Sequence, residues 1–356
     1  MPLSIVERIR QIFRGRSNVA TKGKRNLRLV QLEDRRMLNA TFAFAADTLD
    51  LSAFAGVSSL EISEATLSVD GSNVNAYSFT IDAGTWGGDS SPTGIEVVGG
   101  TELRIATSLF TDVASDNPTI NIVDAANSFD ITISSPVNLV HDATHTGLLN
   151  IDVVGSVSQT GLASDALVVG NLSFNNLTLL DLSHATNDFD FIGGTATGAI
   201  SIADADDIAV NSLTSGSTIT LTSLGSINDA QDDLAADFTA GGLITLTADD
   251  EIGGSAPASA IDVDQRLEFA ANSTVDASST MSGNIELRGL GAIILQDVDT
   301  ADGSIDVDAD GTLTATDVAS LTDNNANDIT LTANGATSDI AVRLINAGNT
   351  GDVTLT

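Results

Sequence analysis

The sequence has no cysteine, and its first forty residues hold most of its positive charge. The absence of cysteine excludes disulfide bonds and cysteine-ligated metal sites. After residue 40 there are four arginines and no lysine against 45 acidic residues, a net charge of −41. A body with such a field repels nucleic acid and anionic membranes, so we expect no nucleic-acid partner. No run approaches the ~18 apolar residues of a membrane span, so we predict no transmembrane segment.

Proline and large aromatic side chains are also scarce, with five prolines, one tryptophan and one tyrosine. Glycine is plentiful at 31 residues, and 39 of the 48 acidic residues are aspartate rather than glutamate. Aspartate competes with the helical backbone and favours turns and strand ends, whereas glutamate favours helix. This composition indicates short strands joined by many tight turns.

Residues 1–45 form a basic leader that differs from the acidic body. Ten of the fourteen cations lie in residues 1–40 against three acids, a net charge of +7. Ile5, Ile9 and Ile12 recur at helical spacing and predict a short basic amphipathic helix. This helix is either a solvated start of the chain or a segment that contacts a membrane surface, and both interpretations fit the pattern.

The leader ends in a segment with a specific order of residues. It consists of Leu32, Glu33, Asp34, Arg35, Arg36, Met37 and Leu38. The segment resembles the N-terminal region of planctomycete extracellular proteins, in which a basic leader ends in this kind of motif. The resemblance implies export to the cell surface or the extracellular space and implies no activity. The apolar h-region of an ordinary secretory signal does not precede it, and Ala43-Phe44-Ala45 is the candidate cleavage site.

Pairs of apolar residues separated by one polar residue recur in the second half of the chain. The clearest pairs are Ile200/Ile202, Ile219/Leu221, Ile244/Leu246, Leu267/Phe269, Ile285/Leu287, Ile305/Val307, Ile329/Leu331 and Val353/Leu355. Their first residues are 19, 25, 23, 18, 20, 24 and 24 positions apart, a period of about 22. Such an irregular period is typical of solenoid coils that share a cross-section and vary in their turns. Weaker copies lie upstream at Leu103/Ile105, Ile120/Ile122, Ile151/Val153 and Leu172/Phe174.

Two architectures use strands of this kind. An antiparallel sandwich prefers turn signals about every 8–12 residues. A parallel β-helix stacks the equivalent strands of successive coils ~4.8 Å apart. One return of the same pattern per coil favours the β-helix, in the right-handed sense that parallel crossovers adopt. The predicted fold class is therefore all-β, a right-handed parallel β-helix (β-solenoid) behind a short basic leader.

The chain divides into three expected parts. Residues 1–45 are the export leader, residues 46–94 a β-rich N-terminal cap, and residues 95–356 the repeats. A cap is expected because an open coil end exposes an unpaired sheet edge. The sequence stops at Gly-Asp-Val-Thr-Leu-Thr, within a strand of a repeat, which favours an array truncated at its C-terminus.

One segment matches the spacing of a calcium-binding loop, D-x-D-x-D-G-x5-(D/E), and is similar to one half of a dockerin repeat. Its candidate ligands are Asp306, Asp308, Asp310 and Asp317. However, Ile305 and Val307 keep the repeat register, which requires an extended strand. Outward residues two apart on a strand are ~6.6 Å apart, too far to share one ion readily. We favour the repeat coil, with weak calcium binding as the one cofactor interaction to consider.

Other groups carry less weight as sites. If all the apolar pairs form one row, Glu268, Glu286 and Asp306 stack as an acidic ladder, with simple solvation favoured over divalent-ion binding. His141 and His145 have i, i+4 spacing, but no glutamate completes a zinc motif. Three aspartate pairs invite a glycosidase interpretation but lie in expected turns: Asp206/Asp207, Asp232/Asp233 and Asp249/Asp250. We therefore predict no catalytic residue.

These observations predict an exported cell-surface or extracellular protein with a structural or adhesive role and no catalytic activity. Its partner would be a cell-surface polysaccharide or another surface protein. The alternative is a polysaccharide-active β-helix enzyme of the lyase or glycosidase type. Clustered carboxylates in a cleft, with an arginine on the helix flank, would favour that alternative.

Overall fold

The computed structural model describes residues 40–45, 47–69, 71–110, 117–140, 147–161, 165–231, 233–254 and 266–356. The predicted leader helix and export motif lie outside these residues. Strands dominate the described chain, with one 3-10 turn at Thr107–Phe110. None of the helical structure described is long and apolar enough to cross a membrane.

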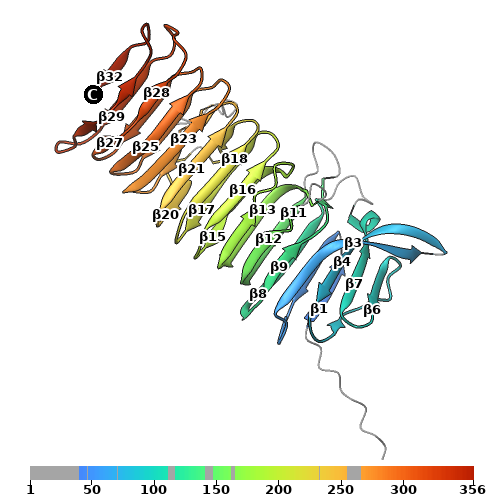
Figure 1. Cartoon of the computed structure of the whole chain (residues 1–356). Coiled ribbons are helices and arrows are strands. Elements are labelled where there is room, and N and C mark those ends of the chain that lie inside the picture. Colours follow the sequence, from blue (N-terminus) through green and yellow to red (C-terminus); the bar gives the residue numbers. More distant parts are fainter. Residues whose placement is uncertain are drawn as a thin grey trace, which may run out of the picture. The chain divides into compact units, whose positions relative to one another are not determined.

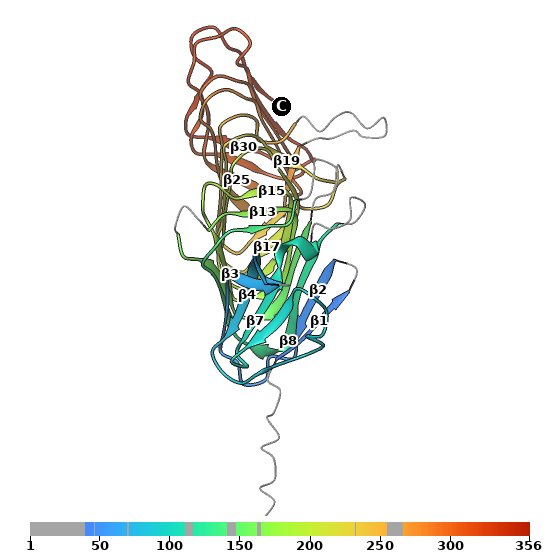
Figure 2. The ribbon, with the colours of Figure 1, turned by 90° about the vertical axis from the view of Figure 1, so that its right-hand side faces the viewer.

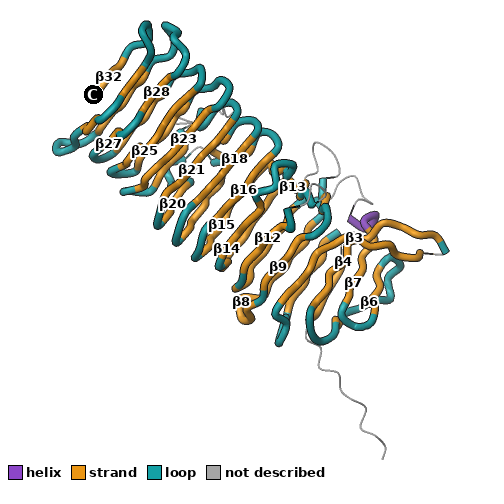
Figure 3. Tube along the Cα trace, viewed as in Figure 1, coloured by secondary structure: helices purple, strands orange, loops and turns teal. Residues whose placement is uncertain are grey.

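The strands form two sheets, here called A and B (Figures 1 and 3). Sheet A contains, in spatial order, β5 (Trp86–Gly87), β1 (Ala40–Ala45), β2 (Thr48–Ser52), β8 (Thr119–Ser128), β11 (Leu148–Val154), β13 (Leu167–Leu177), β15 (Asp188–Ala196), β17 (Ile208–Ser215), β20 (Phe238–Ala240), β22 (Leu267–Phe269), β24 (Ile285–Gly289), β26 (Ile305–Ala309), β29 (Ile329–Ala333) and β32 (Val353–Leu355). Two short strands pair beside this path: β10 (Val137–Asn138) and β19 (Ile227–Asp229).

In the parallel coils, the strand that follows along the chain after each sheet A strand on the path from β8 to β29 belongs to sheet B. It contains β6 (Ile95–Val98), β7 (Glu102–Ala106), β4 (Ser72–Ile81), β3 (Ser59–Val69), β9 (Asp130–Ile133), β12 (Ser156–Gln159), β14 (Leu179–Leu182), β16 (Ile200–Asp204), β18 (Ile219–Ser223), β21 (Leu243–Ala248), β23 (Ser273–Ser279), β25 (Ile293–Thr300), β27 (Leu313–Ala315) and β30 (Ile340–Val342). Beside it lie β28 (Val318–Ser320) and β31 (Ile345–Asn346).

From β8 onward every described strand pairs in parallel with a strand of a neighbouring coil. Figure 2 shows the chain returning over itself from one colour to the next. Apolar and polar residues alternate along each strand, so one face of each sheet lines a shared core. The prediction of an all-β solenoid built of parallel coils is confirmed.

The predicted single row of apolar pairs is wrong. The pairs that begin at Ile200, Ile219 and Ile244 lie in sheet B, whereas those from Leu267 onward lie in sheet A. Each coil supplies two strands with the same apolar-x-apolar pattern, so spacing along the chain does not identify the sheet. Because the connection between residues 252 and 267 is longer than in other coils, the pair found 23 residues after Ile244 belongs to sheet A instead of sheet B.

The acidic ladder predicted from that row is also wrong, because Glu268 does not belong to it. Glu286 does stack on Asp306, but Glu268 lies opposite Arg288 in the sheet register. Arg288 in turn lies opposite Asp308. The face therefore alternates acid, base and acid, which reduces the repulsion that three stacked carboxylates would create.

Antiparallel strands cover the N-terminal end of the coils. β1 pairs with β2, and β3, β4, β7 and β6 pair in turn, all antiparallel, while β2 and β3 also pair in parallel with β8 and β9. Trp86 is buried here against Phe42 and Phe54, and its indole N–H donates to the carbonyls of Phe79 and Thr101 at 3.0 Å.

This antiparallel region extends past the expected boundary at residues 94 and 95. It includes β6 and β7, and the next parallel coil begins with β8 at Thr119. The pair Leu103/Ile105 resembles a repeat strand because parallel and antiparallel strands share the same two-residue alternation.

The corners between strands use buried hydroxyls and glycines. Thr300 and Ser320 each donate from Oγ to a glycine carbonyl of the preceding coil, at 2.8 and 3.0 Å. Gly216 lies where a Cβ would approach the carbonyl oxygen of Thr197 to 2.3 Å, so only glycine lets the coils approach this closely. Buried polar groups are thereby satisfied without breaking the stack.

The first prediction tests the inward and outward faces of one strand. Leu221→Asp should destabilise the protein by about 3–5 kcal/mol, because Leu221 is fully buried and the new charge has no partner in the apolar row. Thr220→Asp is the matched control, since Thr220 faces outward between Ser201 and Thr245 and should cost under about 1 kcal/mol. Urea unfolding followed by circular dichroism measures both. Equal losses would contradict the register.

Candidate functional site

Two successive coils carry extra residues at the same place on sheet A. The first set lies between β19, which ends at Asp229, and β20, which begins at Phe238; both strands pair with β17. In the next coil Ile252 forms an isolated bridge and the strand resumes only at Leu267. Insertions in solenoids gather on one face and often mark the binding face, so the side chains at their bases are the first candidates for a functional site.

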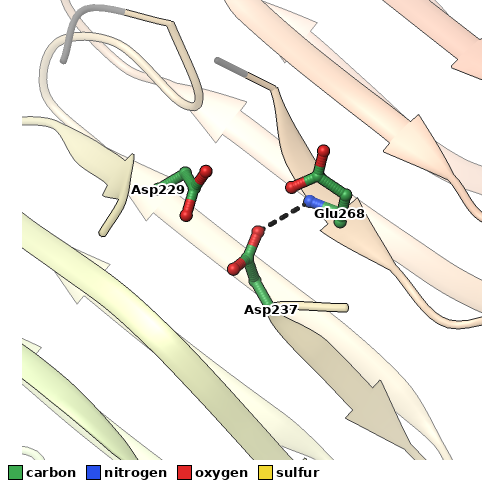
Figure 4. A group of neighbouring side chains, drawn as sticks. All are labelled: Asp229, Asp237 and Glu268. Atoms are coloured by element: carbon green, nitrogen blue, oxygen red, sulfur yellow. Dashed lines mark hydrogen bonds between the residues drawn. The ribbon is translucent and has the colours of Figure 1, made fainter. Parts of the chain in front are cut away.

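Three carboxylates meet at the bases of these insertions: Asp229, Asp237 and Glu268 (Figure 4). One oxygen from each lies within 4.8 Å of the other two. The residues are 6%, 3% and 1% exposed, respectively. Glu268 donates its backbone N–H to Asp237 Oδ2 at 2.8 Å, and Asp229 Oδ1 accepts the N–H of Gln231 at 2.8 Å. The main chain therefore holds two of the three carboxylates in place.

Burial changes the protonation of this cluster. Loss of solvation raises the pKa of Asp237 to about 8. The hydrogen bond from the Glu268 backbone opposes the rise, and the negative charges of Asp229 and Asp233 add to it. An aspartic acid with such a pKa is largely protonated at neutral pH, which lowers the charge that the site must bury.

The geometry permits two chemical states. The cluster can share protons among its carboxylates, or one oxygen of each residue can bind a single divalent cation. Ligands at 2.3–2.6 Å from a calcium ion lie at most ~5 Å apart, so the three oxygens fit one ion. A polymer chain cannot reach all three, because each residue is at least nine-tenths buried. The raised pKa of Asp237 favours the protonated state.

Two arginines lie along the same face. Arg288 is the register neighbour of Glu268 in the next coil, and its guanidinium lies 3.4 Å from Asp310. Arg266 donates to Asp306 Oδ2 at 2.7 Å. These cations offset part of the negative charge on sheet A beside the cluster.

The four aspartates of the predicted calcium loop are not gathered around one point. Asp306 and Asp308 extend along β26, Asp310 follows that strand, and Asp317 precedes β28 beside sheet B. Asp306 pairs with Arg266, and Asp308 accepts from the Asn334 side chain. Among the described residues, Asp229, Asp237 and Glu268 are the only three carboxylates that lie close enough to share an ion.

The remaining candidates are dispersed or lie outside the described residues. His141, His145, Asp232 and the export motif are outside them. Asp206/Asp207 and Asp249/Asp250 occupy corners between strands, as expected. Asp207 Oδ1 accepts the N–H of Ser226 at 2.7 Å, so this carboxylate supports a turn.

Sequence reasoning missed the buried cluster. Asp229 and Asp237 lie in an aspartate-rich stretch, 39 and 31 residues before Glu268 in the sequence. The usable signal was the lengthened spacing between Ile219 and Ile244, which marked extra residues in that coil. Spacing indicates an insertion, but burial of its acids depends on how the inserted residues fold back.

The second prediction uses the protonation of Asp237. Its pKa is raised on folding, so the folded state binds the proton more tightly, and stability falls as pH rises from about 4 toward about 8. Asp237→Asn removes the titrating group. At pH 5 the melting temperature of the variant should lie within about 2 °C of that of the parent, and at pH 9 it should be higher than that of the parent. Thermal melts at both values measure the difference.

The exposed Asp339→Asn is the control and should shift the melting temperature equally at both pH values. A contrary result would be an Asp237→Asn variant that is less stable than the parent at pH 9, by a margin that grows when calcium chloride is added. That outcome would show that the ionised carboxylate binds a cation.

Comparison with known proteins gives no relative from which a role could be transferred. No family model, curated protein or solved structure matches the chain.

Proposed function

We propose that this chain is an exported, non-catalytic β-solenoid that acts in a structural or adhesive role at the cell surface or in the extracellular space. The observation that carries the proposal is the uninterrupted parallel pairing of sheets A and B from β8 to the last described coils. Such a stack presents long, regular side-chain rows to the outside, which suits spacing or multivalent contact better than chemistry at one point. The leader motif at Leu32–Leu38 supports export through its resemblance.

The acidity of the body supports an extracellular partner that is not an anionic polymer. Residues 41–356 hold 45 acids and four arginines, which keeps the stack soluble and repels nucleic acid. A surface polysaccharide or another surface protein remains the proposed partner class.

The proposal that the protein is non-catalytic has one structural support. The strongest carboxylate cluster among the described residues, Asp229, Asp237 and Glu268, is buried. A glycosidase or lyase needs its acid and base within hydrogen-bond reach of the substrate. Side chains that are 1–6% exposed do not offer that access.

One observation favours the alternative, a polysaccharide-active enzyme. The cluster combines an aspartic acid of raised pKa with neighbouring carboxylates and an arginine on the same face. A protonated carboxyl beside an ionised one is the pairing that glycoside hydrolysis uses. This candidate requires the three buried carboxylates to become accessible to a substrate.

The third prediction concerns location. In the organism that carries the gene, mild protease treatment of intact cells should degrade the protein, and extracted protein should begin between residues 38 and 46. The control is Arg35→Ala/Arg36→Ala, which alters the motif and should leave uncleaved protein inside the cell. Protease-resistant protein that begins at Met1 or Pro2 would contradict export.

The fourth prediction separates the structural role from the enzyme. Purified protein incubated with neutral and acidic polysaccharides should release no new reducing ends and no unsaturated products. Glu268→Gln is the matched variant. Product release by the parent that Glu268→Gln abolishes would establish the enzyme and overturn the proposal.

A further inference from the structure

A groove of about 590 Å³ lies on sheet A, one coil before the insertions. Its walls come from β13, β15 and β17, with contributions from β8 and β11. The volume falls in the range of sites that bind small ligands. The groove shares no residue with the buried carboxylate cluster, so it is a separate feature.

A glycine in mid-strand makes the hollow. In the register of β13, β15 and β17, Ser173 lies opposite Gly193, and Gly193 lies opposite Ser212. In this row across the three strands, Ser173 and Ser212 carry side chains, and Gly193 between them carries none. A Cβ at Gly193 would meet its nearest atom, Asn211 Cβ, at 3.3 Å, a tight contact that a shift of the Asn211 side chain by a few tenths of an ångström would relieve.

An aromatic ring borders the hollow. Phe191 lies between Asn171 and Ala209 in the adjacent outward row and is 44% exposed. A phenylalanine in a strand usually buries its ring, because this gains about 1.5–3 kcal/mol. Here the ring presents itself to solvent at the edge of a groove.

The lining combines apolar and polar residues and carries no charge. None of the thirteen described residues that line the groove is acidic or basic, although the body after residue 40 contains 45 acids. Within the described chain, the side chains of Asn171 and Ser173 form no hydrogen bond to protein. An amide and a hydroxyl therefore face the groove with free donors and acceptors.

The first insertion completes the wall. Gln231 donates from its side chain to Asn211 Oδ1, and Ser212 Oγ lies 3.4 Å from the Ala236 carbonyl oxygen. Both contacts tie residues of the insertion to residues that line the groove. The added loop thus gives the groove a fixed end rather than an open run along the sheet.

We infer that this groove binds a neutral saccharide chain. The face of a phenyl ring is electron-rich and attracts the polarised C–H groups of a sugar, while amides and hydroxyls exchange hydrogen bonds with sugar hydroxyls. An uncharged lining in a strongly acidic protein selects against anionic sugars, which the body repels. A peptide fits less well, because the backbone groups of β13, β15 and β17 are already paired with one another and offer no free strand edge.

This inference names the ligand class of the adhesive role and rests on that proposed function for its biological meaning. Its test needs no information on export or catalysis. Loss of sugar binding would leave the location and product assays above unchanged, so the two proposals fail separately.

The experiment is isothermal titration of the full chain with neutral hexasaccharides of β-1,4-, β-1,3- and α-1,4-linked glucose and of β-1,4-linked mannose. At least one should bind, and hexagalacturonate should not. Phe191→Ala should weaken binding about three- to tenfold by removing the ring. Gly193→Val should weaken it on the order of tenfold or more, because a strand-compatible side chain would fill the hollow.

The matched control is Ile294→Ala, which removes an apolar side chain that is 40% exposed on β25 of sheet B. It should bind as the parent does, and circular dichroism melts should show that all three variants are folded. Three results would overturn the inference. They are no heat of binding with any neutral hexasaccharide, equal binding by the parent and both groove variants, and tighter binding of hexagalacturonate or of a neutral peptide.

Discussion

The structure depends on the parallel pairing of each strand with the equivalent strand of the next coil. This pairing satisfies the backbone groups between coils and places apolar residues of successive coils in contact, as Phe238 and Phe269 show with stacked rings 5.3 Å apart. Neither coil could bury its apolar face alone. The ends of such a stack are the weak points, which explains why antiparallel strands around Trp86 cover the N-terminal end.

The same constraint decides where the chain can vary. A single residue added within a strand is absorbed by a bulge, as opposite Ile192 and Gly193, whereas longer additions fit only where a strand ends. The insertions after Asp229 and after Ile252 obey this rule. The first insertion brings Asp229 and Asp237 together and forms the end wall of the groove, and the strand that follows the second insertion adds Glu268 to the cluster. Both candidate features of sheet A are therefore consequences of where the stack permits irregularity.

The sequence was sufficient to predict the solenoid, because alternation of apolar and polar residues is local and the pairs recur about once per coil. It was also sufficient to prefer a strand over a calcium loop at Ile305 and Val307, which the structure places in the core of sheet A. Assignment of each pair to a sheet failed at Leu267. The two strands of a coil have the same pattern, and only their pairing partners distinguish them.

Composition and periodicity by themselves thus determined the all-β class, the repeat, the acidic exterior and the expectation of a basic export leader. Tertiary structure decided which acids are buried together, that Glu268 faces Arg288 rather than Glu286, and that Gly193 leaves a hollow beside an exposed Phe191. The physical reason is that these contacts join residues from different coils. Their meeting depends on the register between strands and on the path of the insertions, and neither property is encoded in the spacing of residues along a single strand.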